Sequence, residues 1–279
     1  METLPITVVI PCGDNIETLA RCLLSVMNQE VKAAQIVVVY NSPNPIPERL
    51  KKYLESQEIS ILDFPELIGP SKARNLGILS SDQEYVAFLD ADDEWIPNKL
   101  LLQFNFMKEN SLSLSTTDFT VVDSVSLKKW NMQNGNYTKK DLQRRCHVGF
   151  GSTTMIRKED LGQSMLFDET LLRFEDWDYM LKFLSSGLGF ANLHMYLTVV
   201  HRVPSANWKK ANSSLLLLEK KYRGTANFNR HFQSGLHLEK AVIDFREKKF
   251  SFFWEVLLSI FLVPKQLLFY FKFVVTRIL

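Results

Sequence analysis

The first half of the chain alternates short apolar runs, rich in β-branched residues, with segments whose apolar positions recur at the period of a helix. Four of these runs predict strands, at residues 6–11, 35–40, 59–63 and 85–89. Residues 16–28 and 71–79 lie between them and predict crossover helices. Strands that alternate with helices are typical of βαβ units. The pattern therefore predicts an α/β, Rossmann-like fold with a mainly parallel sheet flanked by helices.

Beyond about residue 114 this alternation decays, and residues 114–137 have the pattern of a strand, a polar turn and a second strand. The composition changes again towards the end of the chain. We expect one domain over residues 1–205 and a C-terminal helical region over residues 206–279.

The end of the chain, Phe250 to Leu279, is dominated by aromatic and aliphatic residues. Its longest uncharged stretch, Val256 to Pro264, is too short to cross a bilayer, which takes about 20 apolar residues. Basic residues outnumber acidic ones here, which suits the anionic inner leaflet of the cell membrane. We predict amphipathic or hydrophobic helices at the membrane surface. The alternative is a helix that packs on the protein's own core or on a partner chain.

Charge and cysteine content narrow the function classes. The chain has 33 Lys and Arg against 31 Asp and Glu, a formal net charge of +2 that is too balanced for a nucleic-acid-binding face. Cys12, Cys22 and Cys146 have neither zinc-site spacing nor the density of a disulfide framework. The N-terminus lacks the pattern of a secretory signal. We therefore predict a cytoplasmic protein, peripheral at the inner face of the cell membrane, that binds no nucleic acid. The sequence leaves its oligomeric state open.

The strongest chemical signal is a group of carboxylates directly after the predicted strand at 85–89: Asp90, Asp92, Asp93 and Glu94. Ligands of open α/β sheets bind at the carboxyl ends of strands. Carboxylate oxygens suit Mg²⁺ or Mn²⁺, and these ions commonly keep positions open for substrate phosphates. The group therefore predicts a site for a divalent cation.

Two other interpretations of these acids account for them less well. An EF-hand is excluded because, counting from Asp90, Trp95 and Leu101 occupy the positions of its glycine and its last glutamate. Acids that complement the dipole of a helix at residues 99–110 would account for Asp93 and Glu94, but poorly for Asp90 and Asp92.

Several motifs, taken in order, resemble those of the family 2 glycosyltransferases. They are the first strand Val8-Val9-Ile10-Pro11, the segment Ala73-Arg74-Asn75-Leu76-Gly77, the motif Asp90-Ala91-Asp92, the pair Glu175-Asp176 downstream of Phe167-Asp168-Glu169, and His201-Arg202. An ordered set is more specific than any one motif. The resemblance spans about Pro5 to Ser205 and implies a GT-A fold and an inverting enzyme of the type that builds bacterial glycans.

By this resemblance, Asp92 and Asp90 hold Mn²⁺ or Mg²⁺ at the diphosphate of the donor. Such an ion would offset the negative charge that develops on a leaving diphosphate. His201 is a candidate metal or diphosphate contact, with a structural role as the alternative. The remaining positions implied to contact the donor are Pro11, Tyr40, Asn41, Arg74 and Ala91.

Arg74 and the pair Tyr40-Asn41 each allow more than one role. A guanidinium can grip a phosphate or hold an acid in place, and a surface salt bridge is the alternative for Arg74. After the second strand the family usually has one or two aspartates near the nucleotide base, whereas this chain has Tyr40-Asn41. Asn41 can hydrogen-bond a base edge and Tyr40 can stack on it. This departure leaves the identity of the nucleotide open.

Asp176 is the predicted general base, because the attacking hydroxyl of the acceptor must lose its proton to a nearby group. Glu175 and Asp178 are alternatives for this role. A structural interpretation is that these acids cap a helix at residues 177–186.

Together these features predict a metal-dependent hexosyl- or N-acetylhexosaminyltransferase. Its donor would be a nucleotide sugar, with a UDP-sugar as first choice, and its acceptor a hydroxyl of a polysaccharide, lipopolysaccharide or lipid-linked glycan. One rival is a catalytically weak GT-A-like subunit that binds sugar nucleotide or scaffolds a membrane complex. A sugar-phosphate nucleotidyltransferase is the other rival, but it predicts an early glycine-rich loop, and residues 11–15 contain only Gly13.

Overall fold

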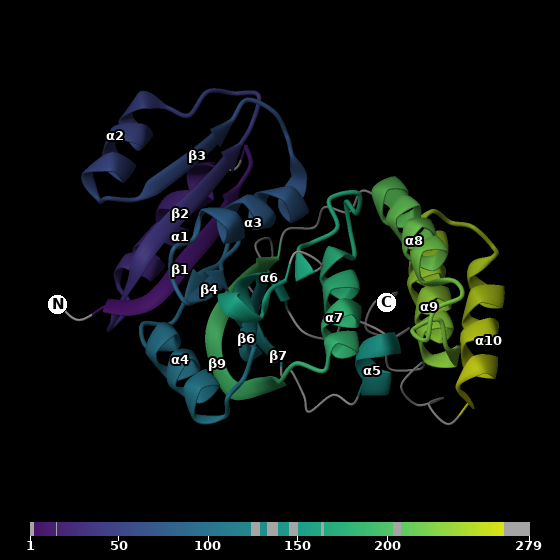
Figure 1. The fold of residues 1–279 in the computed structure, drawn as a ribbon. Coiled ribbons are helices and arrows are strands. Elements are labelled where there is room, and N and C mark those ends of the chain that lie inside the picture. The colour runs from purple at the N-terminus through teal and green to yellow at the C-terminus, as the bar shows by residue number, and fades with distance from the viewer. Residues whose placement is uncertain are drawn as a thin grey trace. The chain divides into compact units, whose positions relative to one another are not determined.

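The computed structural model of the protein describes residues 3–14, 16–123, 129–132, 139–144, 150–162, 165–202 and 208–264. The chain divides into two compact units, drawn as ribbons in Figure 1. The first comprises Met1–Asn136, Val148–Glu169 and Ser186–Pro204. The second comprises Tyr137–His147, Thr170–Ser185 and Ser205–Leu279. The last segment of the second unit begins at Ser205, beside the boundary predicted between residues 205 and 206. An earlier segment of the same unit, Thr170–Ser185, carries Glu175 and Asp176.

The first four strands form the parallel sheet that the sequence predicts. They are β1 (Thr3–Cys12), β2 (Lys32–Asn41), β3 (Ser60–Phe64) and β4 (Tyr85–Phe88), in the spatial order β3-β2-β1-β4. Their connections contain α1 (Ile16–Met27), α2 (Glu48–Ser56) and α3 (Gly69–Ser80). All three ladders are parallel, so the carboxyl ends of these strands share one edge of the sheet.

The rest of the nine-stranded sheet is mixed. Its strands are β5 (Glu94–Trp95), β6 (Leu114–Asp123), β7 (Lys129–Met132), β8 (Met155–Arg157) and β9 (Phe190–Arg202). β8 pairs antiparallel with both β4 and β6, whereas β6 and β9 are parallel. β6 and β7 pair antiparallel, which confirms the predicted pair of strands. Their connection is too short for the crossover that parallel neighbours need, which explains why these two strands pair antiparallel.

The central strands are buried on both faces, which explains why they have continuous apolar runs in the sequence. Val8 and Ile10 of β1 pack in a core with apolar residues of α1 and α4 (Lys99–Glu109). Val9 points to the opposite face, against α3. Gly77 of α3 lies so close to it that a Cβ there would be 2.2 Å from Val9 Cγ1. The glycine of the predicted motif therefore permits close packing of α3 on the sheet.

The second unit is helical. It contains α5 (Lys139–Arg144), α7 (Glu175–Ser186), α8 (Trp208–Tyr222), α9 (Arg230–Arg246) and α10 (Phe252–Leu262). Its core includes Trp177, Leu181, Leu215, Leu218 and Phe232, all nearly or fully buried. Within the described residues, no helix is long and apolar enough to cross a membrane. Residues 265–279, the end of the predicted apolar region, lie outside the described residues.

Candidate active site

The acidic motif lies where the sequence places it, directly after the buried strand β4. Val86, Ala87 and Phe88 are fully buried between β1 and β8. The chain then turns, and the backbone N–H of Asp93 donates to the carbonyl of Asp90 at 3.0 Å. The turn leads into β5, and it sets the carboxylates at the carboxyl edge of the parallel strands. This edge is the place where α/β sheets bind ligands.

Arg74 holds the first of these acids. Its Nη2 donates to Asp90 Oδ1 at 2.8 Å, and its side chain is only 6% exposed. The guanidinium also lies over the ring of Phe167, 5.6 Å from the ring centroid. Such a charge-assisted hydrogen bond from a buried guanidinium fixes the orientation of the carboxylate. The geometry therefore matches the acid-holding role that the sequence left open for Arg74, rather than a surface salt bridge.

The same motif positions a second segment. The Nδ2 of Asn75 donates to the carbonyl of Phe167 at 3.0 Å and to Glu169 Oε1 at 2.9 Å. Its Oδ1 accepts from the backbone N–H of Phe167 at 2.8 Å. Neighbouring residues of the α3 motif thus have separate tasks, because Arg74 holds the acidic turn and Asn75 holds residues 167–169.

Asp92 and Asp93 differ in their surroundings. Asp92 is half-buried, and its carbonyl accepts from Arg21 Nη2 at 2.7 Å. Burial, followed by the charge of Asp90, raises the pKa of Asp92. Asp93 is buried, and burial, followed by the charge of Asp90, raises its pKa well above the ordinary value. Carboxyl groups with raised pKa values beside one another are common at functional sites.

His201 approaches the acidic turn from β9. Its backbone N–H donates to Asp93 Oδ1 at 2.9 Å, and its Nε2 lies 2.6 Å from Glu94 Oε1. Arg21 Nε is 3.2 Å from the same Glu94 oxygen. The structure therefore brings His201 to the predicted site, where its ring contacts Glu94.

Among the described residues, no three His, Cys, Asp or Glu side chains converge closely enough to hold a metal ion by themselves. Mg²⁺ is usually bound through one or two carboxylates together with substrate phosphates. The chain supplies two such groups in Asp90 and Asp92. Burial, followed by repulsion from Asp90, raises the pKa of Asp92, and a bound cation would offset both effects. The residues therefore fit a divalent cation that a bound phosphate group helps to coordinate.

The structure adds two residues that the sequence analysis missed, both in the short helix α6 (Phe150–Thr153). Ser152 Oγ accepts from the backbone N–H of Asp90 at 3.1 Å and donates to Asp93 Oδ2. Gly151 packs so closely that a Cβ would lie 2.3 Å from Asp90 Oδ2. Trp95 Nε1 donates to the carbonyl of Ser152 at 2.7 Å. No local pattern marks this segment, which lies about sixty residues downstream of the acids it positions.

The end of β2 differs from the prediction. The ring of Tyr40 is fully buried, and its hydroxyl donates to the carbonyl of Asn44 at 2.9 Å. Asn41 is also buried, and its Nδ2 donates to the carbonyl of Cys12 at 3.0 Å. The stacking role expected of Tyr40 is therefore wrong for this structure, because a core ring has no exposed face.

An exposed acid lies beside the end of β2 instead. Asp14 follows β1, and its Oδ1 accepts a hydrogen bond from Ser42 Oγ. Asn44 Nδ2 is 3.4 Å from the same oxygen. Asp14 thus supplies a carboxylate at the edge where the chain lacks the aspartates expected after β2. Sequence reasoning missed it because the acid follows a different strand.

The predicted base belongs to the second unit, at the start of α7. This helix begins two residues earlier than predicted, so Glu175 and Asp176 both lie in its first turn. Both are half-buried, and Asp176 Oδ1 accepts from the backbone N–H of Trp177 at 2.7 Å. The preceding Phe174 has a φ of 61°, an uncommon conformation for a non-glycine residue. Such backbone conformations often occur at functional sites.

The structure argues against Asp178 as the general base, one of the alternatives to Asp176. It is fully buried, and its Oδ1 lies 2.7 Å from Lys221 Nζ and accepts from the hydroxyl of Tyr222 at 2.9 Å. Its Oδ2 lies 3.0 Å from Lys182 Nζ. An acid enclosed by these partners stabilises the packing of α7 against α8 and cannot reach a substrate.

The chain is similar in sequence to several glycosyltransferases. It is 27% identical over 216 residues to the putative teichuronic acid biosynthesis glycosyltransferase TuaG of Bacillus subtilis. The matched region covers 75% of this chain and 85% of that protein. It is 24% identical over 221 residues to the amylovoran biosynthesis glycosyltransferase AmsB of Erwinia amylovora, covering 73% and 71%. The chain is 28% identical to an uncharacterized glycosyltransferase of Rickettsia bellii and spans 25% of the length of that protein. It is 25% identical to an uncharacterized glycosyltransferase of Methanocaldococcus jannaschii and spans 64% of its length.

Solved structures share the fold at low identity. The structure of S. aureus TarS 1-349 in complex with UDP-GlcNAc matches with a TM-score of 0.60 and 16% identity, over 86% of this chain and 72% of that one. GalNAc-T7 with UDP, GalNAc and Mn²⁺ matches with a TM-score of 0.61 and 15% identity, over 95% and 57%. These likenesses confirm the predicted GT-A fold. The family model "Glycosyl transferase family 2" matches residues 7–163, more than half of the chain. With the fold and the acidic turn in the order that the sequence predicted, the chain belongs to glycosyl transferase family 2.

Proposed function

We propose that the protein transfers a hexosyl or N-acetylhexosaminyl group from a UDP-sugar to a hydroxyl of a growing bacterial glycan. The observation that carries this proposal is the acidic turn after β4, where Arg74 and Ser152 orient Asp90 and leave Asp92 beside it. Ligand-bound relatives support the choice of nucleotide, since TarS and GalNAc-T7 were solved with UDP-GlcNAc and with UDP. The polysaccharide relatives TuaG and AmsB support the acceptor class.

Asp92 and Asp90 would hold Mn²⁺ or Mg²⁺ at the diphosphate of the donor. When bound, such an ion stabilises the negative charge of the leaving group. The role of this chain is to keep the carboxylates in place. Arg74 fixes Asp90, Ser152 joins the backbone of Asp90 to Asp93, and the ring of His201 stays beside Glu94. We assign His201 a supporting position at the turn, where it can also contact the diphosphate.

Recognition of the nucleotide base would fall to the loop after β1. Asp14 is exposed there, beside Ser42 and Asn44. A carboxylate accepts hydrogen bonds from the N–H groups of a base edge. Asp14 would therefore contact the base in place of the aspartates that the family usually has after the second strand. Asn41 and Pro11 would support the backbone at the same edge of the sheet.

Transfer would be a single displacement. The acceptor oxygen forms a bond to the anomeric carbon while the bond from that carbon to the diphosphate oxygen breaks, which inverts the carbon. The proton of the hydroxyl goes to Asp176, with Glu175 as the alternative base. The nucleoside diphosphate leaves.

We further propose that the enzyme works in the cytoplasm, at the inner face of the cell membrane, and that its acceptor is linked to lipid. The apolar side chains exposed on the second unit support this location.

The proposal is tested by incubating the purified chain with Mn²⁺ and a panel of nucleotide sugars, and by measuring the diphosphate released with and without glycan acceptors. We expect UDP release from one or a few UDP-sugars, and none from Asp92→Asn. The rival function is a GT-A-like subunit that binds sugar nucleotide without transfer, which the buried Tyr40 favours. It predicts Mn²⁺-dependent UDP binding with no release under any condition.

A further inference from the structure

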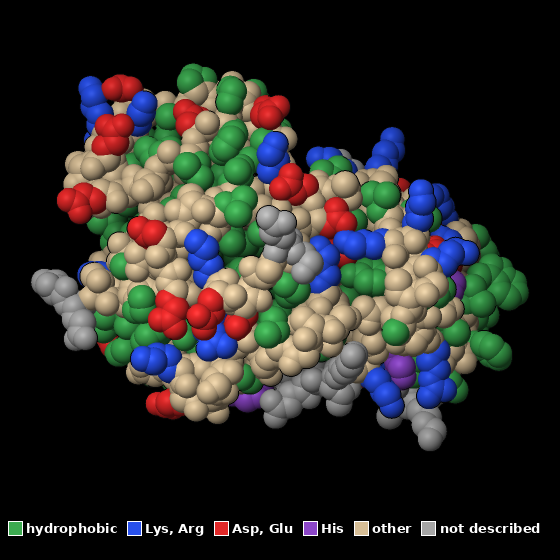
Figure 2. All heavy atoms as spheres, in the orientation of Figure 1, with side chains coloured by type: hydrophobic (Ala, Val, Ile, Leu, Met, Phe, Trp, Pro, Cys, Tyr) green, Lys and Arg blue, Asp and Glu red, His purple; other side chains and the backbone are tan. Residues whose placement is uncertain are grey.

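Helix α10 has the opposite polarity from that of a surface helix on a soluble protein. The two residues that it buries, Glu255 and Ser259, are both polar. Its exposed side chains are large and apolar: Phe253 (52% exposed), Trp254 (70%), Leu257 (55%), Leu258 (45%) and Phe261 (82%). Figure 2 shows hydrophobic side chains gathered over α10, at the right edge of the view. We call these five side chains, with the neighbouring Phe250 (84%), the apolar face.

A set of polar contacts with α9 locks this orientation. Ser259 Oγ donates to the carbonyl of Ser234 at 2.8 Å, and the two hydroxyls lie 2.9 Å apart. Glu255 contacts His237 Nδ1 at 2.6 Å and Lys240 Nζ at 2.5 Å. Burial raises the pKa of Glu255, but Lys240 and His237 outweigh it, and the net shift is downward. Rolling α10 to bury its apolar face would strand these buried polar groups, which is costly.

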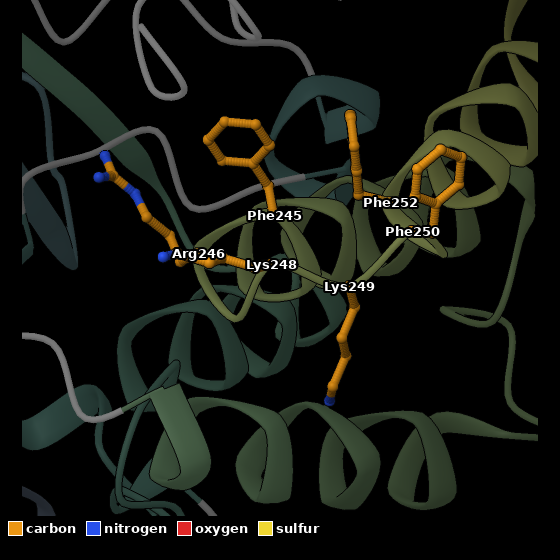
Figure 3. Close-up of a pocket in the computed structure, with 6 residues that line it drawn as sticks. All are labelled: Phe245, Arg246, Lys248, Lys249, Phe250 and Phe252. Carbon is orange, nitrogen blue, oxygen red and sulfur yellow. The ribbon is translucent and has the colours of Figure 1, made fainter.

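Cations gather at one end of the apolar face, at the turn between α9 and α10. A hollow of about 400 Å³ is lined there by Phe245, Phe250, Phe252, Arg246, Lys248 and Lys249. Figure 3 shows the three rings pointing to one side of the turn and Lys249 pointing to the other. Lys249 Nζ pairs with Glu247 Oε2 at 2.5 Å, and Arg246 and Lys248 are exposed. This end therefore presents cations beside apolar rings, as a surface does that binds anionic lipid.

We propose that α10 lies flat on an anionic bilayer, with the apolar face in the boundary between headgroups and acyl chains and with Arg246 and Lys248 at the lipid phosphates. At 11 residues, α10 is about 16 Å long, far short of the roughly 30 Å hydrocarbon core, so it lies on the membrane and does not span it. Trp and Phe favour this boundary. The basic turn argues for anionic lipid over a second copy of the chain, which would meet like charges.

This inference rests on the membrane association proposed above, but its test uses no sugar transfer. The full chain is sedimented with vesicles of phosphatidylcholine alone and of phosphatidylcholine with 30% phosphatidylglycerol, about the range in which charge matters. We compare wild type, the apolar-face variant Trp254→Ser with Phe261→Ser, and the matched control Leu24→Ser with Leu79→Ser. Leu24 and Leu79 are 52% and 66% exposed on the first unit.

Wild type and the control are expected to bind the anionic vesicles equally, and the apolar-face variant at least about tenfold more weakly. Arg246→Gln with Lys248→Gln should lose most of the preference for phosphatidylglycerol while the melting temperature stays within about 2 °C of wild type. Equal binding by the apolar-face variant would overturn the proposal.

Two further outcomes separate the alternatives. A wild-type dimer without lipid that the apolar-face variant converts to a monomer would assign the face to a second copy. Absence of vesicle binding by wild type would refute the membrane association itself, whereas Mn²⁺-dependent UDP binding, measured on the same proteins, reports separately on the transferase proposal.

Discussion

At the residue scale, the acidic turn after β4 carries a charge that the protein offsets only in part. Burial and then Asp90 raise the pKa of Asp92, and the same two causes raise that of Asp93. A carboxyl group with a raised pKa in the folded state stabilises the fold at low pH, and this stabilisation is lost as the pH rises through the raised pKa. Ionisation of these carboxyl groups therefore destabilises the cation-free protein, and a bound cation would offset that cost.

Asp92→Asn is expected to raise the melting temperature of the cation-free protein at pH 7 by about 1–3 °C, because it removes one of the repelling charges. The same change should abolish the Mn²⁺-dependent part of UDP binding. Thermal melts and calorimetry, with and without Mn²⁺, measure the two effects. Glu109→Gln alters an exposed acid at the end of α4 and should change neither. Full Mn²⁺-dependent affinity in Asp92→Asn would exclude Asp92 as a ligand.

Gly151→Ala tests the support beneath Asp90. The added Cβ would lie 2.3 Å from Asp90 Oδ2, so either the carboxylate or α6 must move. We expect a loss of about 1–3 kcal/mol in the free energy of unfolding, as for other overpacked sites, together with weaker UDP binding in the presence of Mn²⁺. Urea unfolding and calorimetry check both. If affinity survives unchanged, the position of Asp90 does not matter for the donor.

At the element scale, α4 is tied to the sheet and to α6 through a buried lysine. Lys99 Nζ donates to Gln103 Oε1 at 2.6 Å and lies 4.1 Å from the centroid of the Trp95 ring. Gln103 Nε2 in turn donates to the carbonyl of Thr153 at 3.0 Å and to Ser115 Oγ at 2.9 Å. Burial lowers the pKa of Lys99 to about 7. One buried polar chain thus links α4, α6 and β6 next to the acidic turn.

This lysine should make stability depend on pH. Between pH 7 and its ordinary pKa of 10.5, the amine binds a proton in the unfolded chain but not in the folded one, so stability rises with pH by at most about 1.4 kcal/mol per unit. Lys99→Met should reduce this slope. Urea unfolding at pH 7.5 and 9.5 measures it, with the exposed Lys108→Met as control. A slope equal to that of wild type in Lys99→Met would mean that the amine stays charged in the fold.

At the scale of the whole molecule, the residues with proposed roles are divided between the two compact units. The donor acids belong to the first unit and Asp176 to the second. Asp176→Asn should therefore lower kcat by about a hundredfold or more, the usual range for a general base, while the affinity for UDP stays the same. Glu175→Gln, one residue away on the same turn of α7, is the matched control. Loss of transfer in Glu175→Gln alone would move the base to Glu175.

Much of the fold could be predicted from the sequence, because local patterns carry it. Continuous apolar runs mark strands that are buried on both faces, and the helical period between them marks the crossovers, so β1 to β4 lie where predicted within three residues. The acidic turn was predictable for the same reason, since its residues are consecutive. The mixed half of the sheet was less predictable, because β8 and β9 pair with strands that lie far away in the sequence, and no repeating pattern marks these pairs.

What only the tertiary structure decided is which distant residues meet. Asn75 reaches Phe167 across 92 positions and Ser152 reaches Asp90 across 62, and no local pattern encodes such pairs. Tyr40 has an aromatic ring that could stack on a base, but the ring lies in the core. Whether a strand residue is buried depends on what packs against the strand. The composition of α10 predicted an amphipathic or hydrophobic helix. Only the contacts of Glu255 and Ser259 with α9 determined that its polar side faces inward and its apolar side outward. The reason is that an amphipathic helix packs with the face whose side chains find partners on the neighbouring element, and α9 offers hydrogen-bonding groups here.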